Sequence, residues 1–346
     1  MLGGVLVART VGQGVGVDIG VVVGGLIVGF VVGLTGMGGG ALMTPMLVLF
    51  FNVNAFTAIS SDLVAAAVMK PVGSLVHMRH GTVAWRIVGW LTLGSVPSAF
   101  LGVFVLRAMG NGEQVQHNLK IALGVTLLFA ATGLIARSYQ NMRNRARSRA
   151  AGLLPDPDQV PEPIVVRPLR TVLIGAAGGL IVGMTSVGSG SLIIIALLAL
   201  YPKLKANSVV GTDLVQAVPL VASAALGHVL FGEFELSLTL SLLLGSVPGV
   251  FLGAQLSSRA PGGLIRRALA LVLVASALKL LGVPTQILGL LLLACVIAGP
   301  FVWASTRSRH GLPRRALLPQ KLAGVRLPGR QRVPKPAEDR VPAESP

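Results

Sequence analysis

Apolar residues in this chain fall in long, nearly continuous runs, with polar residues gathered between them. A helix needs about 20 residues to cross the hydrocarbon core of a bilayer, and several of the runs reach that length. Before a polar interval in the middle of the chain, the runs predict helices at 18–34, 41–51, 55–77, 84–107 and 118–136. After it they predict helices at 169–184, 191–201, 206–230, 235–256, 264–281 and 285–305. The pattern therefore predicts an all-α, polytopic integral membrane protein with about 8–11 membrane segments.

Two of these runs, 41–51 and 191–201, are too short to cross a bilayer. Each follows a break rich in glycine and serine or threonine, which predicts a broken helix with a short second piece. Irregular backbone at membrane depth persists where it is buried in protein or lines a wet cavity. The breaks are therefore expected inside the bundle, and whether the short runs span or re-enter stays open.

The composition agrees with a surface that faces lipid. Hydrophobic residues make up 53% of the 346 residues and charged residues 12%, whereas soluble domains carry roughly 25% charged residues. The net charge of +17 raises the question of nucleic-acid binding. However, the basic residues flank apolar helices and are not interleaved with the aromatic side chains on which bases stack, so no nucleic-acid partner is expected. The single cysteine, Cys295, excludes an internal disulfide.

The two halves of the chain carry the same motifs in the same order. Segments 24–107 and 178–259 each contain a break rich in small residues, then an aspartate after Ser or Thr, then a histidine, then Gly-Ser-Val-Pro. Asp62 corresponds to Asp213 and His77 to His228, both at an offset of 151 residues. Chance similarity between apolar helices does not explain this shared order, so the sequence predicts an internal duplication.

Basic residues cluster after the fifth run and again in the tail, and such clusters mark the cytoplasmic side of a membrane. An odd number of passes precedes the first cluster. The N-terminus is therefore predicted on the outer side of the cytoplasmic membrane and the C-terminus on its cytoplasmic side. The two halves then have inverted topology, a plan that recurs in secondary transporters. We expect a first transmembrane repeat at 1–137, a cytoplasmic Arg- and Pro-rich linker at 138–168, a second transmembrane repeat at 169–284, a final transmembrane helix at 285–305 and a disordered basic cytoplasmic tail at 306–346.

The candidate substrate-binding residues are the small and hydroxyl-bearing residues of the two breaks. They are Thr35, Gly36, Gly38, Gly39 and Gly40 in the first break, and Thr185, Ser186, Gly188, Ser189, Gly190 and Ser191 in the second. A helix that begins after such a break presents free N–H groups and the positive end of its dipole, and hydroxyl groups add donors. Two such helix starts brought together would make an anion cradle. The alternative is that the small residues serve close helix packing alone.

Several ionisable residues fall inside the predicted spans. Asp62 and Asp213 are candidate proton- or cation-coupling residues, because intramembrane acids are costly and lie off the lipid; helix capping is the alternative. Lys70, before the kinking residue Pro71, is a further candidate for substrate binding, with snorkelling to the interface as the alternative. His77 and His228 lie near helix ends and are expected to be interface anchors or caps, with protonation switching as the alternative. No metal-ligand cluster is visible, and no cofactor is expected.

These motifs resemble those of the TauE/SafE family of sulfite and organosulfonate exporters. The resemblance rests on Gly33–Gly40 with Pro45, Ser61-Asp62 and Gly94–Pro97 with Gly102, and in the second half on Thr185–Ser191, Gly211–Asp213, Gly227-His228 and Gly245–Pro248. It covers roughly residues 17–281 and implies a permease of the cytoplasmic membrane. Members of the family are linked to sulfite, sulfoacetate, thiosulfate and related small anions. The two halves differ here, since Val221 stands opposite Lys70 and serines replace glycines in the second break.

The sequence thus predicts a secondary transporter that moves a small anion by alternating access, in contact with the lipid bilayer and with a homo-oligomer as one possible assembly. A membrane-embedded aspartyl protease is disfavoured because Asp213 is not preceded by Gly-x-Gly. A serine protease is disfavoured because Ser186 and Ser189 do not form a Gly-x-Ser-x-Gly elbow. A membrane assembly or sensor component is the other alternative, with the basic tail as its partner-binding segment. No enzymatic activity is expected.

Overall fold

The computed structural model describes residues 16–35, 39–79, 81, 83–110, 112–150, 165–188, 190, 192–202, 204, 206–257 and 262–309. Within these ranges the chain forms eleven α-helices and no strand. The first five are α1 (Ile19–Thr35), α2 (Gly40–Phe50), α3 (Ala55–Arg79), α4 (Trp85–Ala108) and α5 (Glu113–Ala150). The others are α6 (Pro168–Thr185), α7 (Leu192–Leu200), α8 (Ala206–Phe231), α9 (Leu236–Ser257), α10 (Gly262–Leu280) and α11 (Thr285–Arg309).

Each helix predicted from an apolar run is present, and most ends agree within a few residues. The main correction concerns α5, which was expected at 118–136 but runs from Glu113 to Ala150. Residues 138–150, assigned to the linker, are therefore helical. This stretch contains no glycine or proline before Gly152, and its Arg, Gln, Met and Ala residues have high helix propensity. The helix can therefore continue once the apolar run has ended.

Five helical stretches are long and apolar enough to cross a membrane, counting only the described residues. They are Trp85–Ala108, Glu113–Gln140, Pro168–Thr185, Ser208–Phe231 and Leu236–Leu256. Large apolar side chains on their surfaces are exposed, as a lipid-facing bundle requires. Examples are Leu93, Phe129 and Phe251, each more than half exposed. The chain is an all-α, multi-pass membrane protein.

The two short helices fold back on the helices that precede them. A Cβ placed on Gly20, at the start of α1, would lie 3.1 Å from the ring of Phe51, just after α2. In the second half, the N–H of Arg167 before α6 donates to the hydroxyl of Tyr201 after α7 at 2.9 Å, and Thr171 also bonds this hydroxyl. Each pair is therefore an antiparallel hairpin whose turn is the break.

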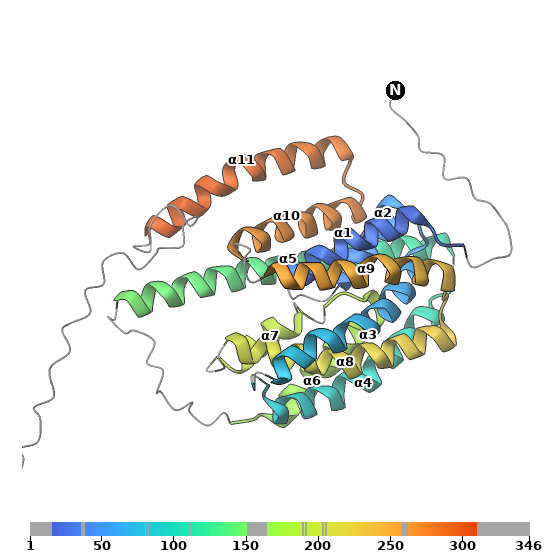
Figure 1. Ribbon diagram of the computed structural model, residues 1–346, viewed down its shortest axis with the longest axis horizontal. Helices are drawn as coiled ribbons and strands as arrows, with labels where there is room; N and C mark the ends of the chain where they lie inside the picture. Colours follow the sequence, from blue (N-terminus) through green and yellow to red (C-terminus); the bar gives the residue numbers. More distant parts are fainter. Residues whose placement is uncertain are drawn as a thin grey trace, which may run out of the picture.

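The long helices pair between the two halves of the chain. Helix α1 packs along α9, α4 along α6, α3 along α8, and α5 along α10; Figure 1 shows α1 beside α9 and α4 beside α6. Glycines make two of these contacts very close. A Cβ on Gly245 would lie 1.9 Å from the carbonyl oxygen of Val22, and one on Gly94 would lie 2.1 Å from that of Val172. Close packing thus accounts for the glycines within these helices.

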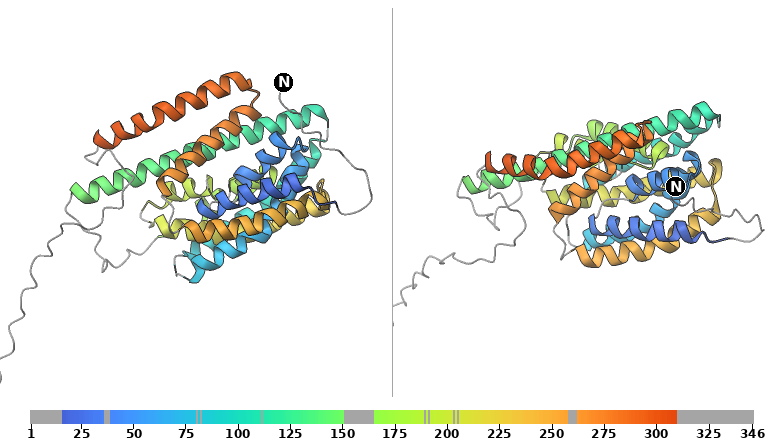
Figure 2. Two further views of the ribbon diagram at one scale, coloured as in Figure 1. Left: turned by 45° about the horizontal axis from the view of Figure 1, so that its top comes forward. Right: turned by 90° about the horizontal axis from the view of Figure 1, so that it is seen from above.

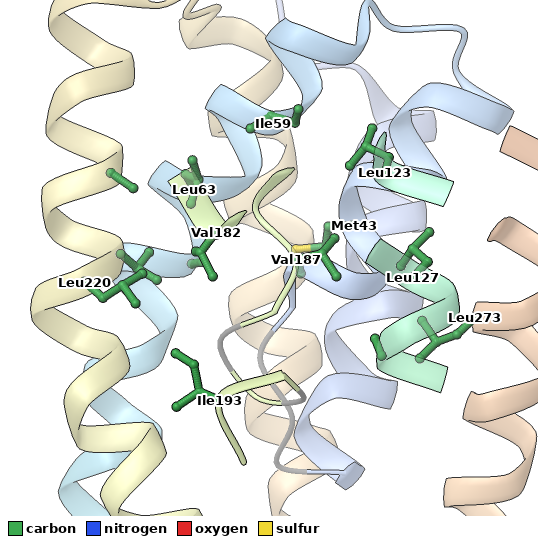
Figure 3. Close-up of a cluster of buried hydrophobic side chains, with 14 of the residues drawn as sticks. Met43, Ile59, Leu63, Leu123, Leu127, Val182, Val187, Ile193, Leu220 and Leu273 are labelled. Carbon is green, nitrogen blue, oxygen red and sulfur yellow. The ribbon is translucent and has the colours of Figure 1, made fainter. Parts of the chain in front are cut away.

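Helix α3 lies inside the bundle, where α2, α5, α8 and α9 pack against it. Helix α11 packs on α10 and lies at the edge of the bundle in Figure 1 and in the left view of Figure 2. The centre of the molecule is an apolar cluster in which Met43 of α2 lies close to Val187 of the second break (Figure 3). Leu123 and Leu127 of α5 lie on one side of this pair and Leu220 of α8 on the other. The described residues Gly39, Gly40 and Ser186–Gly188 of the two breaks are therefore buried in the protein interior, as expected.

Candidate functional site

The second break is held in a defined, non-helical shape. Ser186 follows the last residue of α6 with φ of 58°, in the left-handed region, and its N–H donates to the carbonyl oxygen of Val182 at 2.7 Å. The hydroxyl of Thr185 donates to the carbonyl oxygen of Ile181 at 2.7 Å, and the N–H of Val187 donates to that hydroxyl at 3.2 Å. Because its hydroxyl is engaged by neighbouring backbone, Thr185 shapes the break.

Gly188 has φ of 127°, which side chains rarely tolerate, and its carbonyl oxygen accepts the N–H groups of Gly190 and Leu192 at 3.0 and 3.1 Å. This glycine therefore turns the chain from the end of α6 into α7.

The two breaks meet backbone to backbone. A Cβ on Gly40, the first residue of α2, would lie 2.0 Å from the carbonyl oxygen of Ser186 and 2.9 Å from its hydroxyl oxygen. Gly39 precedes α2 and provides no side-chain cap. The start of α2 therefore lies against the end of α6, and only glycine fits at position 40.

Asp62 of α3 lies where the breaks meet, with 0% of its side chain exposed. Its Oδ2 accepts a hydrogen bond from the hydroxyl of Thr44 in α2 at 2.6 Å and another from the hydroxyl of Ser186 at 2.9 Å. Its Oδ1 accepts no hydrogen bond from the part of the chain that the structure describes. Asp62 thus joins donors from both halves of the chain, and these bonds do not cap its own helix.

Two further charged residues are buried near this point. The side chains of Lys70 and Asp213 are 6% and 1% exposed. Lys70 interacts electrostatically with Asp213 and also with Asp62. Among the described residues, Lys70 is the only buried lysine or arginine. The ammonium is therefore held inside the protein between two acids, and it does not snorkel to the interface.

His228 lies in the interior and does not anchor the membrane interface as expected. Its side chain is 0% exposed, with Nδ1 lying 2.7 Å from the hydroxyl of Ser60 and Nε2 lying 2.8 Å from the carbonyl oxygen of Gly183. It therefore links α8 to α3 and α6. The side chain of His77 lies outside the described residues.

The polar interior extends toward α4 through Gln216 of α8. Its Nε2 donates to the hydroxyl of Ser95 in α4 at 2.6 Å. Its Oε1 and the hydroxyl of Ser61 are buried and find no hydrogen-bond partner among the described residues. A buried polar oxygen without a partner is uncommon in native proteins, and it is a place where a ligand or water can bind.

The structure brings together only part of the predicted set. Gly39, Gly40, Ser186 and Gly188 lie at the junction of the breaks, and Gly190 lies just before α7. The hydroxyl of Thr35, the last residue of α1, donates to the carbonyl oxygen of Val31 at 2.9 Å. Gly36, Gly38, Ser189 and Ser191 lie outside the described residues.

Two residues of the site were missed in the sequence. Thr44 and Gln216 sit in apolar stretches, and their counterparts in the other half are Ile194 and Ala65. In each case the available signal in the sequence was a polar residue in one half that corresponds to an apolar residue in the other half.

This arrangement defines a class of protein: a multi-pass membrane protein in which broken helices from two halves meet around buried polar groups, as in secondary transporters. The family model "Sulfite exporter TauE/SafE" matches residues 21–280. The chain belongs to the TauE/SafE family.

Curated relatives agree with this assignment. The chain is 36% identical over 249 residues to the "Probable membrane transporter protein YjnA" of Bacillus subtilis strain 168, covering 72% of this chain and 93% of YjnA. It is 24% identical over 250 residues to the "Probable membrane transporter protein YdhB" of the same organism, covering 71% of this chain and 93% of YdhB. No solved structure matches the chain significantly. The family and these relatives support a membrane transporter.

Proposed function

We propose that this chain is a secondary transporter that moves small anions across the cytoplasmic membrane by alternating access, and that it is not an enzyme. Sulfite, organosulfonates and related sulfur oxyanions are the proposed substrate class. The observation that carries the proposal is the junction of the two breaks, where hydroxyl donors of Thr44 and Ser186 converge on one buried point. Oxyanions suit such a point because each oxygen can accept a hydrogen bond from a hydroxyl or from a helix N-terminus.

The directions of the helices support inverted repeats as the frame for this transport. Ser60, near the start of α3, contacts His228, near the end of α8. Lys70, further along α3, interacts with Asp213, nearer the start of α8. Helices α3 and α8, which correspond to each other in the two halves, therefore run in opposite directions. Such halves can exchange conformations around a central site, which opens it to each side in turn.

The same helix directions agree with the proposed orientation of the chain in the membrane. If the two hairpins re-enter and the other helices cross, α3, α4 and α5 make three passes before the basic end of α5. Four further passes by α8 to α11 return the tail to that side. The basic segments then face the cytoplasm and the N-terminus faces outside, as the distribution of basic residues favours. The proposed partners are the lipid bilayer and a small anion, and a homo-oligomer is a further expectation.

Transport of labelled anions by purified protein in liposomes tests this function. Sulfite, thiosulfate and sulfoacetate would each be supplied at a higher concentration outside than inside, and uptake would be compared with that of empty liposomes. We expect uptake of at least one sulfur anion, and a strong reduction in Thr44→Val, which keeps the shape of the side chain and removes its donor. Ile194→Val, at the corresponding position of the second half, serves as the control. Absence of uptake of every anion, with folded protein in the liposomes, would refute the proposal.

A further inference from the structure

We propose that the carboxylate of Asp62 occupies the anion-binding donors of this transporter, so that an anion can bind only together with a proton that neutralises Asp62. This inference rests on the proposed function, because it specifies how a substrate anion replaces the Asp62 carboxylate as the hydrogen-bond acceptor at the same junction.

The number of hydroxyl hydrogens limits what the junction of the breaks can bind. A hydroxyl group has a single hydrogen and can donate one strong hydrogen bond at a time. In this structure the hydrogens of Thr44 and Ser186 both point to Oδ2 of Asp62, at 2.6 and 2.9 Å. A bound oxyanion would need these same hydrogens. The carboxylate of Asp62 and a substrate anion therefore compete for one pair of donors.

The residues at the junction of the breaks are closely packed. Gly40 lies so close to Ser186 that even a Cβ would come within 2.0 Å of the Ser186 carbonyl oxygen, and Asp62 is fully buried beside them. The described arrangement is therefore closed around Asp62. Binding of a substrate requires this carboxyl group to give up its two bonds.

The net charge of the buried side chains also limits anion binding. Asp62, Asp213 and Lys70 are the buried ionisable side chains of this centre, and they sum to one negative charge when all three are ionised. Adding a monovalent anion would raise this to two in a region that water does not reach, which is costly. If Asp62 takes up one proton as the anion enters, the charge of the centre stays the same. The protonated carboxyl group also becomes a donor, so it can bond the anion that replaces it.

Other titratable groups lie on the elements that pack against α3. Helices α2 and α9 carry none, and α8 contributes Asp213 and His228. On α5 the titratable side chains fall in the first turns, at Glu113, His117 and Lys120, and toward the end beyond Ala136. After α8, Glu233 accepts a hydrogen bond from Thr57 at 3.4 Å. Of these groups and Lys70, none accepts a hydrogen bond from Thr44 or Ser186 in the described structure, whereas Asp62 accepts both.

The test is the number of protons taken up when an anion binds. Calorimetric titration of the purified protein with ethanesulfonate and with methanesulfonate, both monovalent and ionised throughout the working range, would be run in buffers of different ionisation enthalpy. We expect about one proton per anion and an affinity that falls about tenfold per pH unit once Asp62 is ionised. In Asp62→Asn we expect no proton uptake and an affinity independent of pH. The control variant Glu113→Gln, at an exposed acid in the first turn of α5, should keep both properties of the native protein.

Substitution of the donors provides a second measurement. Ser186→Gly removes the hydroxyl and suits the left-handed backbone there, and it introduces the residue found at the corresponding Gly36. We expect it to weaken anion binding at low pH by about tenfold, the effect of one hydrogen bond to a charged group.

The outcomes separate the two proposals. Anion binding by the native protein without proton uptake would overturn this inference and leave the transport function standing. Proton uptake that persists in Asp62→Asn and disappears in His228→Gln would assign the proton to another group and would also overturn it. If neither anion binds to the native protein or to Asp62→Asn at any pH, and no liposome uptake occurs, the transport function fails and the inference fails with it.

Discussion

Replacing Gly40 by alanine should disrupt the junction of the two breaks. The added Cβ would lie 2.0 Å from the carbonyl oxygen of Ser186 and 2.9 Å from the carbonyl carbon. Ordinary contacts of a Cβ are longer than about 3.4 Å, so the start of α2 and the end of α6 must separate by more than an ångström. Overpacking of this kind costs about 1–3 kcal/mol of stability. The movement would also lengthen the bond from Ser186 to Asp62, so we expect transport to be nearly abolished.

The matched control for this substitution is Gly89→Ala. Gly89 lies within α4, and a Cβ there would have no neighbour within 4 Å. Alanine should therefore be neutral or stabilise this helix by up to about 1 kcal/mol. Both variants would be compared with the native protein by thermal unfolding in detergent and by anion uptake in liposomes. If Gly40→Ala unfolds at the same temperature as the native protein and transports at the same rate, the contact between the breaks is not as described.

Three further substitutions test other parts of the account. Lys70→Met should lower the free energy of unfolding by about 3–5 kcal/mol, because it leaves buried acids without their cation; adding Asp213→Asn should recover much of this loss in denaturation experiments. His228→Gln should destabilise the protein by about 1–3 kcal/mol through loss of one of its two hydrogen bonds, and an unchanged unfolding midpoint would argue against the link between α8, α3 and α6. Gly245→Ala should separate α9 from α1, since its Cβ would lie 1.9 Å from the carbonyl oxygen of Val22, and unaltered folding yield and melting would contradict the packing.

Much of the fold could be predicted because a lipid environment imposes simple rules. Apolar runs predicted the positions of the eleven helices that the described residues form. Whether the two short runs span or re-enter was left open by the sequence, and the structure shows that each packs back on the helix before it. The end of α5 could not be found in this way, because the helix continues through a polar segment after the apolar run has ended. Hydropathy detects helices that are buried in a membrane, but it does not predict helices that lie in water.

The site was predictable in its backbone and less so in its side chains. The glycine-rich breaks indicated where irregular backbone would be buried, but the contact between Gly40 and Ser186 joins the start of α2 to the end of α6, whereas two helix starts were expected to meet. The bonds from Thr44 and Ser186 to Asp62 join residues up to 124 positions apart, and no local pattern records such a contact. His228 was misplaced because its position near the end of a run suggested the membrane interface, whereas helix crossing places it inside.

The most direct test of the central claim is an experimental structure of the protein with ethanesulfonate at acidic pH. The account predicts density for the anion at the junction of the breaks, within hydrogen-bond distance of the hydroxyls of Thr44 and Ser186, with Asp62 turned away from at least one of them. Density for the anion at a remote site, with both hydroxyls still bonded to Asp62, would contradict the account.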